Sequence, residues 1–368
     1  MSTAPWLEAA REALPESLFH DFTITAHPVT GDPFELDVDG TADVVFDEAW
    51  SPHVQLAQAP CKVPEHQAAL DALDPRAGTR VTVAAGYVYP GGRRDVHQLA
   101  DLALRERPVE RPANTMSLHA VSDEMRLQDT DPLGASHTFA ATTLVRDAIM
   151  YLIGWLLDPD PTIVLTATST RTLGEPLTVQ TGANLWSVVV ELQDRIDAWV
   201  YVDGARTWHV TDRPHLAGVS AHQMHVGPGG TVTASTAALD VREWGNAVLL
   251  QYPDDTFAFA QITTGPLAVG TVPTKVVKQS RTVDVGSTLN RWAVAETLLR
   301  RVYSRGRGFT LTAVAAYWLR PGHTVTVQLP TGPQERHLVA RVTFHLGTGR
   351  MTVVTRVPDD TPTITTGA

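Results

Sequence analysis

The chain has 368 residues and a mass of 39.9 kDa, a length that predicts two or three domains. Hydrophobic residues make up 43% of it and charged residues 19%, which excludes an intrinsically disordered protein. The net charge of −11 disfavours a protein that holds nucleic acid through its phosphates. Cys61 is the single cysteine, so a disulfide within the chain and a cysteine-rich zinc site are excluded.

The sequence predicts neither a membrane span nor a secretory signal. The longest apolar run, Ala148–Leu157, is too short to cross a bilayer. The first residues have neither a basic start nor an apolar segment of the kind that directs secretion. We therefore expect a soluble protein that does not insert into membranes.

The N-terminal part of the chain has strand-type patterns after one short helix, which is predicted over residues 3–14. Strands are expected at Phe22–Ala26 and Phe34–Val38, where apolar residues alternate with polar ones. Arg80–Tyr89 is a longer run of the same type. It ends at Pro90-Gly91-Gly92, which predicts a hairpin with a second strand beyond the turn.

The middle of the chain mixes helices and strands. Apolar residues recur on one face of a predicted helix that ends at Leu157. A second helix is predicted over Leu185–Ile196, with Asn184 as its N-cap. Asp203-Gly204 lies between two alternating runs, a pattern that predicts a tight β-hairpin.

The C-terminal part returns to strands around one helix, predicted over Thr288–Tyr303 and ended by Gly306. Strands are predicted over Thr231–Ser235, Ala247–Tyr252, Thr256–Ile262, Lys275–Gln279, Thr310–Val314, Thr324–Leu329, Arg336–His345 and Met351–Val357.

These patterns predict a mainly β chain with an α+β insert. The expected divisions are an N-terminal helical arm (1–14), a first β region (15–140), a small α/β module (141–213), a second β region with one helix (214–357) and a flexible tail (358–368). The two β regions are of similar size, which is compatible with a diverged duplication.

Few residues are arranged for chemistry, and no phosphate-binding loop, nucleophile elbow or zinc-protease motif occurs. His222 and His225, with His215 nearby, could face one metal ion, but solvated loop histidines are the alternative. Asp37-Val38-Asp39-Gly40 resembles the start of a calcium loop, but it lacks the later acidic ligand, so a plain hairpin turn is favoured.

Two further groups of residues could be reactive, but a structural role is favoured for each. Asp123 and Glu124 are adjacent acids, which a strand would point to opposite faces, so a turn or capping role is favoured over a carboxylate pair. Lys62 could lower the pKa of Cys61, but a structural thiol is favoured. We therefore predict no catalytic residue, no cofactor and no metal ion.

Arg300, Arg301, Arg305 and Arg307 form the one basic cluster. They surround the end of the predicted helix 288–303, where cations complement the helix dipole. The alternatives are a solvated helix end, a protein interface and a nucleic-acid contact, and the acidic net charge counts against the last.

Several segments, in their order and spacing, resemble the tail hub proteins of tailed bacteriophages, a family related to the baseplate hub of contractile phages. The clearest is the C-terminal run YWLRPGHTVTV at 317–327, in which His323 stands where Asp is common. The other matching segments are Ser117–Asp129, Gly182–Pro214, Trp244–Val248, Glu335–Val339 and Gly349–Arg356.

The resemblance implies a homotrimer in which each chain carries two tube-like antiparallel β-barrels, one in each β region. Three chains would then join a six-fold tail tube to a three-fold tip and enclose a channel through which genome DNA passes without specific binding. The implied partners are a tail tube or distal tail protein, tip spike or fibre proteins and the tape measure protein, at the tail tip of a virion. We predict that the arginine cluster (Arg300, Arg301, Arg305, Arg307), Trp318 and Arg320 are interface residues.

Two other functions are kept as alternatives. A receptor- or carbohydrate-binding tail module would expose Trp186, Trp199 and Trp208 as stacking residues. A tail-associated peptidoglycan hydrolase would need His, Asp and Glu side chains that converge within residues 141–213.

Overall fold

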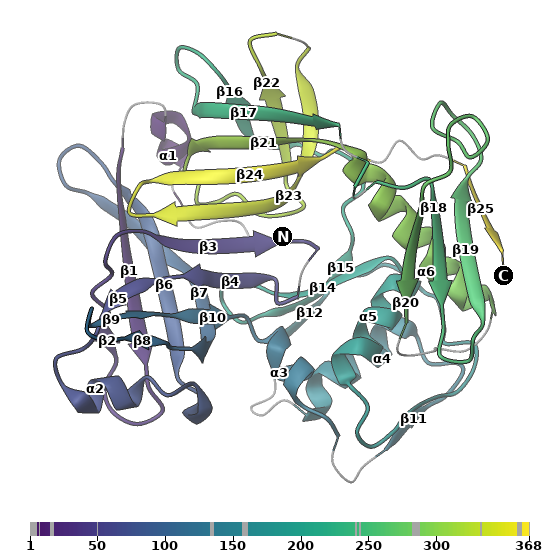
Figure 1. The fold of residues 1–368 in the computed structure, drawn as a ribbon, viewed down its shortest axis with the longest axis horizontal. Helices are drawn as coiled ribbons and strands as arrows, with labels where there is room; N and C mark the ends of the chain where they lie inside the picture. Colours follow the sequence, from purple (N-terminus) through teal and green to yellow (C-terminus); the bar gives the residue numbers. More distant parts are fainter. Residues whose placement is uncertain are drawn as a thin grey trace.

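The computed structural model describes residues 6, 8–14, 18–49, 51–132, 136–156, 161–239, 241–242, 244–281, 288–331, 333–358 and 363–367. The architecture is mainly β, as predicted, with one large sheet beside two smaller units that contain most of the helix (Figure 1). Among the described residues, no helix is long and apolar enough to cross a membrane.

The large sheet has 13 strands, in the order β17-β21-β24-β23-β3-β4-β10-β7-β6-β1-β2, with β22 added to β23 and β16 added to β22. Its strands are β1 (Phe19–His27), β2 (Phe34–Glu35), β3 (Ala42–Asp47), β4 (Val54–Gln58), β6 (Arg80–Val88), β7 (Arg94–Glu106), β10 (His119–Val121), β16 (Ser220–His225), β17 (Val232–Leu239), β21 (Arg307–Val314), β22 (Thr324–Gln328), β23 (Glu335–Leu346) and β24 (Arg350–Arg356).

The two β regions meet within this sheet, because β3 pairs antiparallel with β23 from Ala42↔Leu346 to Asp47↔Arg341. The expectation of two separate closed barrels therefore needs correction: the described strands form one open sheet that runs through both regions. The physical reason is that alternating side chains mark a strand without marking its partner, and here the partners are about 300 residues apart in sequence.

The two regions also share one hydrophobic core. The Tyr87 hydroxyl of β6 donates a hydrogen bond to the carbonyl of Ala315 (2.7 Å) and accepts one from the backbone N–H of Tyr317 (3.1 Å). The two tyrosine rings lie 5.3 Å apart. Tyr87 is fully buried, so these bonds fix how the C-terminal segment crosses the first region.

A smaller sheet flanks the first region, in which α2 (Gln67–Ala72) and a 3₁₀ turn, η2 (Pro75–Ala77), precede β6. Helix α1 (Glu8–Ala13) lies elsewhere, where Arg11 is 5.6 Å from the ring centre of Trp318. Its strands are β5 (Pro60–Lys62), β8 (Val109–Glu110) and β9 (Thr115–Ser117).

The α/β module has its own core, formed by the apolar faces of α4 (Val145–Leu156) and α5 (Leu185–Arg195). Both helices and the Asp203-Gly204 hairpin are confirmed, and the Asn184 side chain caps α5 by accepting from the N–H of Ser187 (2.9 Å). Its other elements are α3 (Glu124–Asp129), β11 (His137–Phe139), β12 (Ile163–Leu165), β13 (Leu177–Val179), β14 (Ala198–Val202) and β15 (Trp208–Asp212).

A third unit, with a separate core, lies inside the predicted second β region. Helix α6 (Thr288–Tyr303) has the predicted bounds, is followed by η3 (Ser304–Gly306), and packs on a sheet in the order β20-β18-β19-β25. Its strands are β18 (Ala247–Gln251), β19 (Phe257–Ile262), β20 (Val276–Ser280) and β25 (Ile364–Gly367). Strand β25 falls in the predicted flexible tail, and its pairing with β19 gives this segment a fixed place next to the C-terminus (Figure 1).

Candidate functional site: an assembly surface

The candidate metal and nucleophile sites do not assemble. The described residues contain no group of three or more His, Cys, Asp or Glu side chains that could hold a metal ion. His222 packs against Trp318 (5.6 Å between ring centroids), and burial lowers the pKa of His222 to about 4. His215 instead pairs with Asp197 (2.6 Å). Burial raises the pKa of Cys61 to about 12, so this thiol is protonated and unreactive at neutral pH.

The two adjacent acids have structural roles at the junction between the large sheet and the α/β module. Asp123 pairs with Arg80 (2.8 Å) and Arg206 (2.9 Å). Glu124 is buried, and its Oε1 accepts from the backbone N–H groups of His53 (3.1 Å) and Val202 (2.9 Å). Burial raises the pKa of Glu124 to about 7.

The three tryptophans that a carbohydrate-binding module would expose are buried. Trp186, Trp199 and Trp208 are 9%, 5% and 1% exposed. A stacking platform for a sugar needs exposed ring faces, so their positions count against a carbohydrate-binding role for these rings.

The arginine cluster divides between the surface and the interior. Arg300 pairs with Glu296 one turn back on α6 (2.7 Å), and Arg307 pairs with Glu335 (2.6 Å) while remaining half-exposed. Arg301 points inward and pairs with Asp194 (2.6 Å). Arg305 is partly exposed. The cluster is therefore not one continuous basic patch.

Trp318 and Arg320 lie where the C-terminal motif crosses the shared core. Trp318 is 2% exposed, and its indole N–H donates to the carbonyl of Ala221 (3.3 Å). Arg320 donates to the carbonyl of Tyr317 (2.7 Å) and places its guanidinium 4.2 Å from the ring centre of Phe46. Both side chains thus make these contacts within their own chain, and their role as interface residues stays a prediction.

A buried ion network joins the α/β module to the third unit, and nothing in the sequence indicated it. Arg281 (2.7 Å) and Arg301 (2.6 Å) both contact the carboxylate of Asp194 on α5. Burial alone would raise the pKa of Asp194, but the two arginines outweigh it and hold the pKa below its ordinary value. Glu191 completes the group beside Arg281 (3.4 Å).

One end of the large sheet, β17, is a long free edge. Among the described residues, β17 pairs with β21 on one side and with no strand on the other. The seven residues from Thr233 to Leu239 are all exposed, and Leu239 reaches 85%. Beside this edge is an open groove of about 490 Å³, lined by apolar residues that include Phe309 and Leu329, with Arg307 at its side.

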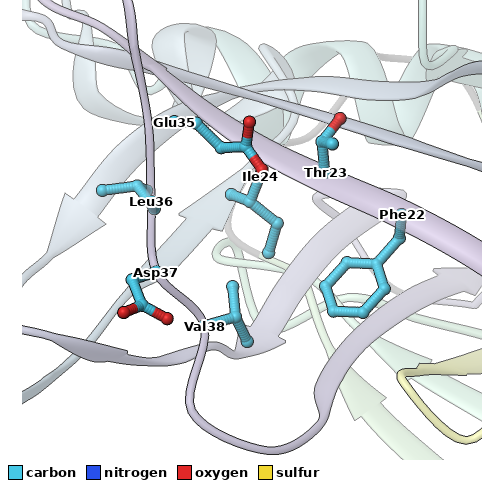
Figure 2. Close-up of a pocket in the computed structure, with 7 residues that line it drawn as sticks. All are labelled: Phe22, Thr23, Ile24, Glu35, Leu36, Asp37 and Val38. Atoms are coloured by element: carbon cyan, nitrogen blue, oxygen red, sulfur yellow. The ribbon is translucent and has the colours of Figure 1, made fainter.

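The opposite end of the sheet is also open. β1 pairs with β2 only at Thr25↔Glu35 and Ala26↔Phe34. The N–H of Leu36 still donates to the carbonyl of Ile24 (2.9 Å). Beyond Leu36 the chain diverges from β1, and a hollow of about 400 Å³ lies between them (Figure 2). Phe19, at the start of β1, is 76% exposed.

Comparison with known proteins identifies the fold. No family model matches the sequence, and no curated protein matches it. A tail protein from Neisseria meningitidis MC58 superposes with a TM-score of 0.62 at 12% identity, covering 92% of this chain and 97% of that one. The 43 kDa tail protein of prophage MuSo2 from Shewanella oneidensis gives 0.61 at 11% identity, covering 91% and 98%.

A chain of the Francisella PdpA–VgrG complex gives a TM-score of 0.55 at 9% identity, covering 97% of this chain and 62% of that one. Identities this low establish the fold and not the function. The chain has the fold of the Neisseria and Shewanella tail proteins, which confirms, at the level of the fold, the resemblance predicted from the sequence.

Proposed function

We propose that the chain is a structural protein of a phage tail: a homotrimeric hub at the distal tip that joins the six-fold tail tube to a three-fold tip. The observation that carries this proposal is the likeness in fold to tail proteins along nearly the whole chain. The absence from the described residues of a metal-ligand group, and the burial of the tryptophans, leave assembly as the role that the surface supports best.

The organisation of the sheet supports the proposed change of symmetry. The strands of residues 19–121 and those of residues 220–356 form two parts of one sheet, joined at β3–β23. If each part serves as one tube-like domain, three chains offer six such domains to the tube and one three-fold set of modules to the tip. Neighbours in this proposal are a tail tube or distal tail protein, spike or fibre proteins and the tape measure protein.

The charge of the chain fits a channel that DNA crosses without binding. Each chain carries −11, and a trimer carries three times that charge. A negative wall repels phosphates and disfavours the counterion release on which nonspecific DNA binding depends. In this proposal the protein belongs to the virion, at the tail tip.

Light scattering on the purified chain tests the proposal. We expect the mass of three chains of 39.9 kDa, and co-sedimentation of this trimer with assembled tail tube. A protein that remains monomeric at all accessible concentrations and never binds tube would overturn it.

A further inference from the structure

The free outer edge of β17 lacks the features that protect other exposed edges. Natural sheets protect such edges with lysine, proline, bulges or very short strands. β17 is eight residues long, and its sequence VTASTAAL has no charge and no proline. Its one register shift lies at the start, between Val232 and Ala234. An edge of this kind is a ready template for pairing with a strand of another chain.

The direction of each backbone group on β17 follows from its pairing. Val314 of β21 donates to the carbonyl of Thr231 (3.0 Å), so the backbone groups of Val314 face β17. Facing alternates along a strand, so Thr310, four residues before Val314, also faces β17. The register pairs Thr310 with Thr236, and Thr236 therefore turns its N–H and C=O toward β21. Ala237, the next residue, turns its own toward the free side, as do the residues two positions away on either side.

The free edge of β1 also offers outward backbone groups, which could pair with those of the β17 edge. Leu36 donates to the carbonyl of Ile24 (2.9 Å), so alternation turns the backbone groups of Phe22 and His20 away from β6 as well. Phe22 lines the hollow of Figure 2. Phe19 projects into solvent beside this edge, while the groove beside β17 is lined by apolar residues.

The charged side chains beside the two edges are mostly paired within the chain. Arg307 lines the groove beside β17 and pairs there with Glu335 (2.6 Å). Glu35 borders the β1 edge, and Asp37, two residues further along, pairs with Lys62 (2.7 Å). The fit between the two edges therefore rests on backbone groups and apolar surface.

We infer that the occupant of the β17 edge is the β1 edge of a second copy of the chain, so that the large sheet continues from one copy into the next. This inference rests on the proposed trimer and specifies its interface. The two edges are unlike, so the contact is head-to-tail, and a head-to-tail contact that closes after three copies pairs the β17 edge and the β1 edge of every copy. Backbone hydrogen bonds supply the affinity, and Phe19 in the apolar groove supplies the specificity.

Ala237→Pro tests the β17 side. Proline there removes an N–H that faces outward, so the pairing with β21 is kept while pairing with a neighbour is lost. We expect the variant trimer to dissociate at a protein concentration at least about tenfold higher than the concentration at which the unsubstituted trimer dissociates. Thr366→Pro is the matched control: Thr263 donates to the carbonyl of Thr363 (3.0 Å), so alternation turns the N–H of Thr366 outward from β25, on an edge outside the proposed contact.

Phe19→Asp tests the β1 side without touching β17. It should weaken the trimer to a similar extent, whereas Val29→Asp, at a residue 67% exposed in the following turn, should leave the trimer intact. An equimolar mixture of the Ala237→Pro and Phe19→Asp chains retains one good edge of each kind, so sedimentation should find a 1:1 heterodimer.

The outcomes separate the inference from the proposed function. If the unsubstituted chain and both folded edge variants are equally stable trimers, the edges are not the interface and the trimeric hub stands. If Ala237→Pro dissociates the assembly and Phe19→Asp does not, β17 pairs with itself, and the head-to-tail contact is wrong. If the unsubstituted chain is a monomer that binds tail tube through β17, the occupant is the tube protein and the inference is overturned. Ser235→Pro, which also removes an outward N–H, replaces Ala237→Pro if that variant fails to fold.

Discussion

Glu124 is the residue at which protonation bears most directly on how two parts of the molecule meet. Its Oε1 accepts from β14 and from the loop before β4, while its buried Oε2 has no hydrogen-bond partner. Burial raises its pKa from 4.5 to about 7. A raised pKa means that the folded state holds this proton more tightly than the unfolded chain, so the stabilisation is present below pH 4.5 and lost as the pH rises through 7.

Glu124→Gln should remove this contribution, because glutamine imitates the neutral acid at every pH. Relative to the variant, the unsubstituted protein should lose about 3 kcal/mol of unfolding free energy between pH 4.5 and pH 8. Urea unfolding across this range measures the difference, with the exposed Glu110→Gln as a control. Parallel profiles for the two proteins would show that Glu124 is ionised throughout.

Asp194 should be among the least replaceable charged residues. Asp194→Ala leaves Arg281 and Arg301 without their shared buried partner, and removal of one member of a buried pair costs about 3–5 kcal/mol. Glu296→Ala breaks the exposed pair with Arg300 on the same helix and should cost about 0.5 kcal/mol or less. Chemical unfolding compares the two, and equal effects would contradict the role given to the network.

Residue roles were the hardest part to predict from the sequence. Trp and Arg are enriched both in interfaces and in stacked core contacts. The sequence therefore indicated that Trp318 and Arg320 make important contacts, but not whether these contacts lie within the chain or with a partner. The arginine cluster is contiguous in sequence, yet a helix end turns Arg301 inward and Arg307 outward.

At the scale of elements, local signals gave correct helices and hairpins. The bounds of α6 and the N-cap of α5 follow from periodicity and capping chemistry, which act over a few residues. Strands β16 (SAHQMH) and β25 (ITTG) were missed because their mostly polar residues do not form an alternating apolar pattern. The β3–β23 junction depends on contacts between distant segments, which no local pattern encodes.

The cap of α5 gives a test at this scale. Asn184→Ala removes the acceptor for the N–H of Ser187 and should lower the unfolding free energy by about 1 kcal/mol. Asn184→Ser keeps an acceptor at the cap and should recover most of the loss in a thermal melt. An alanine variant as stable as the unsubstituted protein would show that the cap contributes nothing.

The whole molecule should be sensitive to acid. Burial lowers the pKa of His20, His53, His222 and His323 to about 4. The unfolded chain binds these protons near pH 6.5 and the folded chain does not, so stability is lost as the pH falls from about 6.5 toward 4. Four histidines outweigh the opposite effect of Glu124. The melting temperature should therefore fall steadily below pH 6.5, and a flat profile down to pH 4 would contradict the buried, neutral state of these histidines.

The assembled form is the level at which the proposed function stands or fails. An open sheet with unlike free edges at β17 and β1, the fold of phage tail proteins and an acidic chain fit the proposed ring of three copies around a channel. Electron microscopy of the purified protein tests this most directly. The account predicts class averages of a three-fold ring with six similar lobes and an open centre. Averages of single chains, or of a closed particle without a central channel, would contradict it.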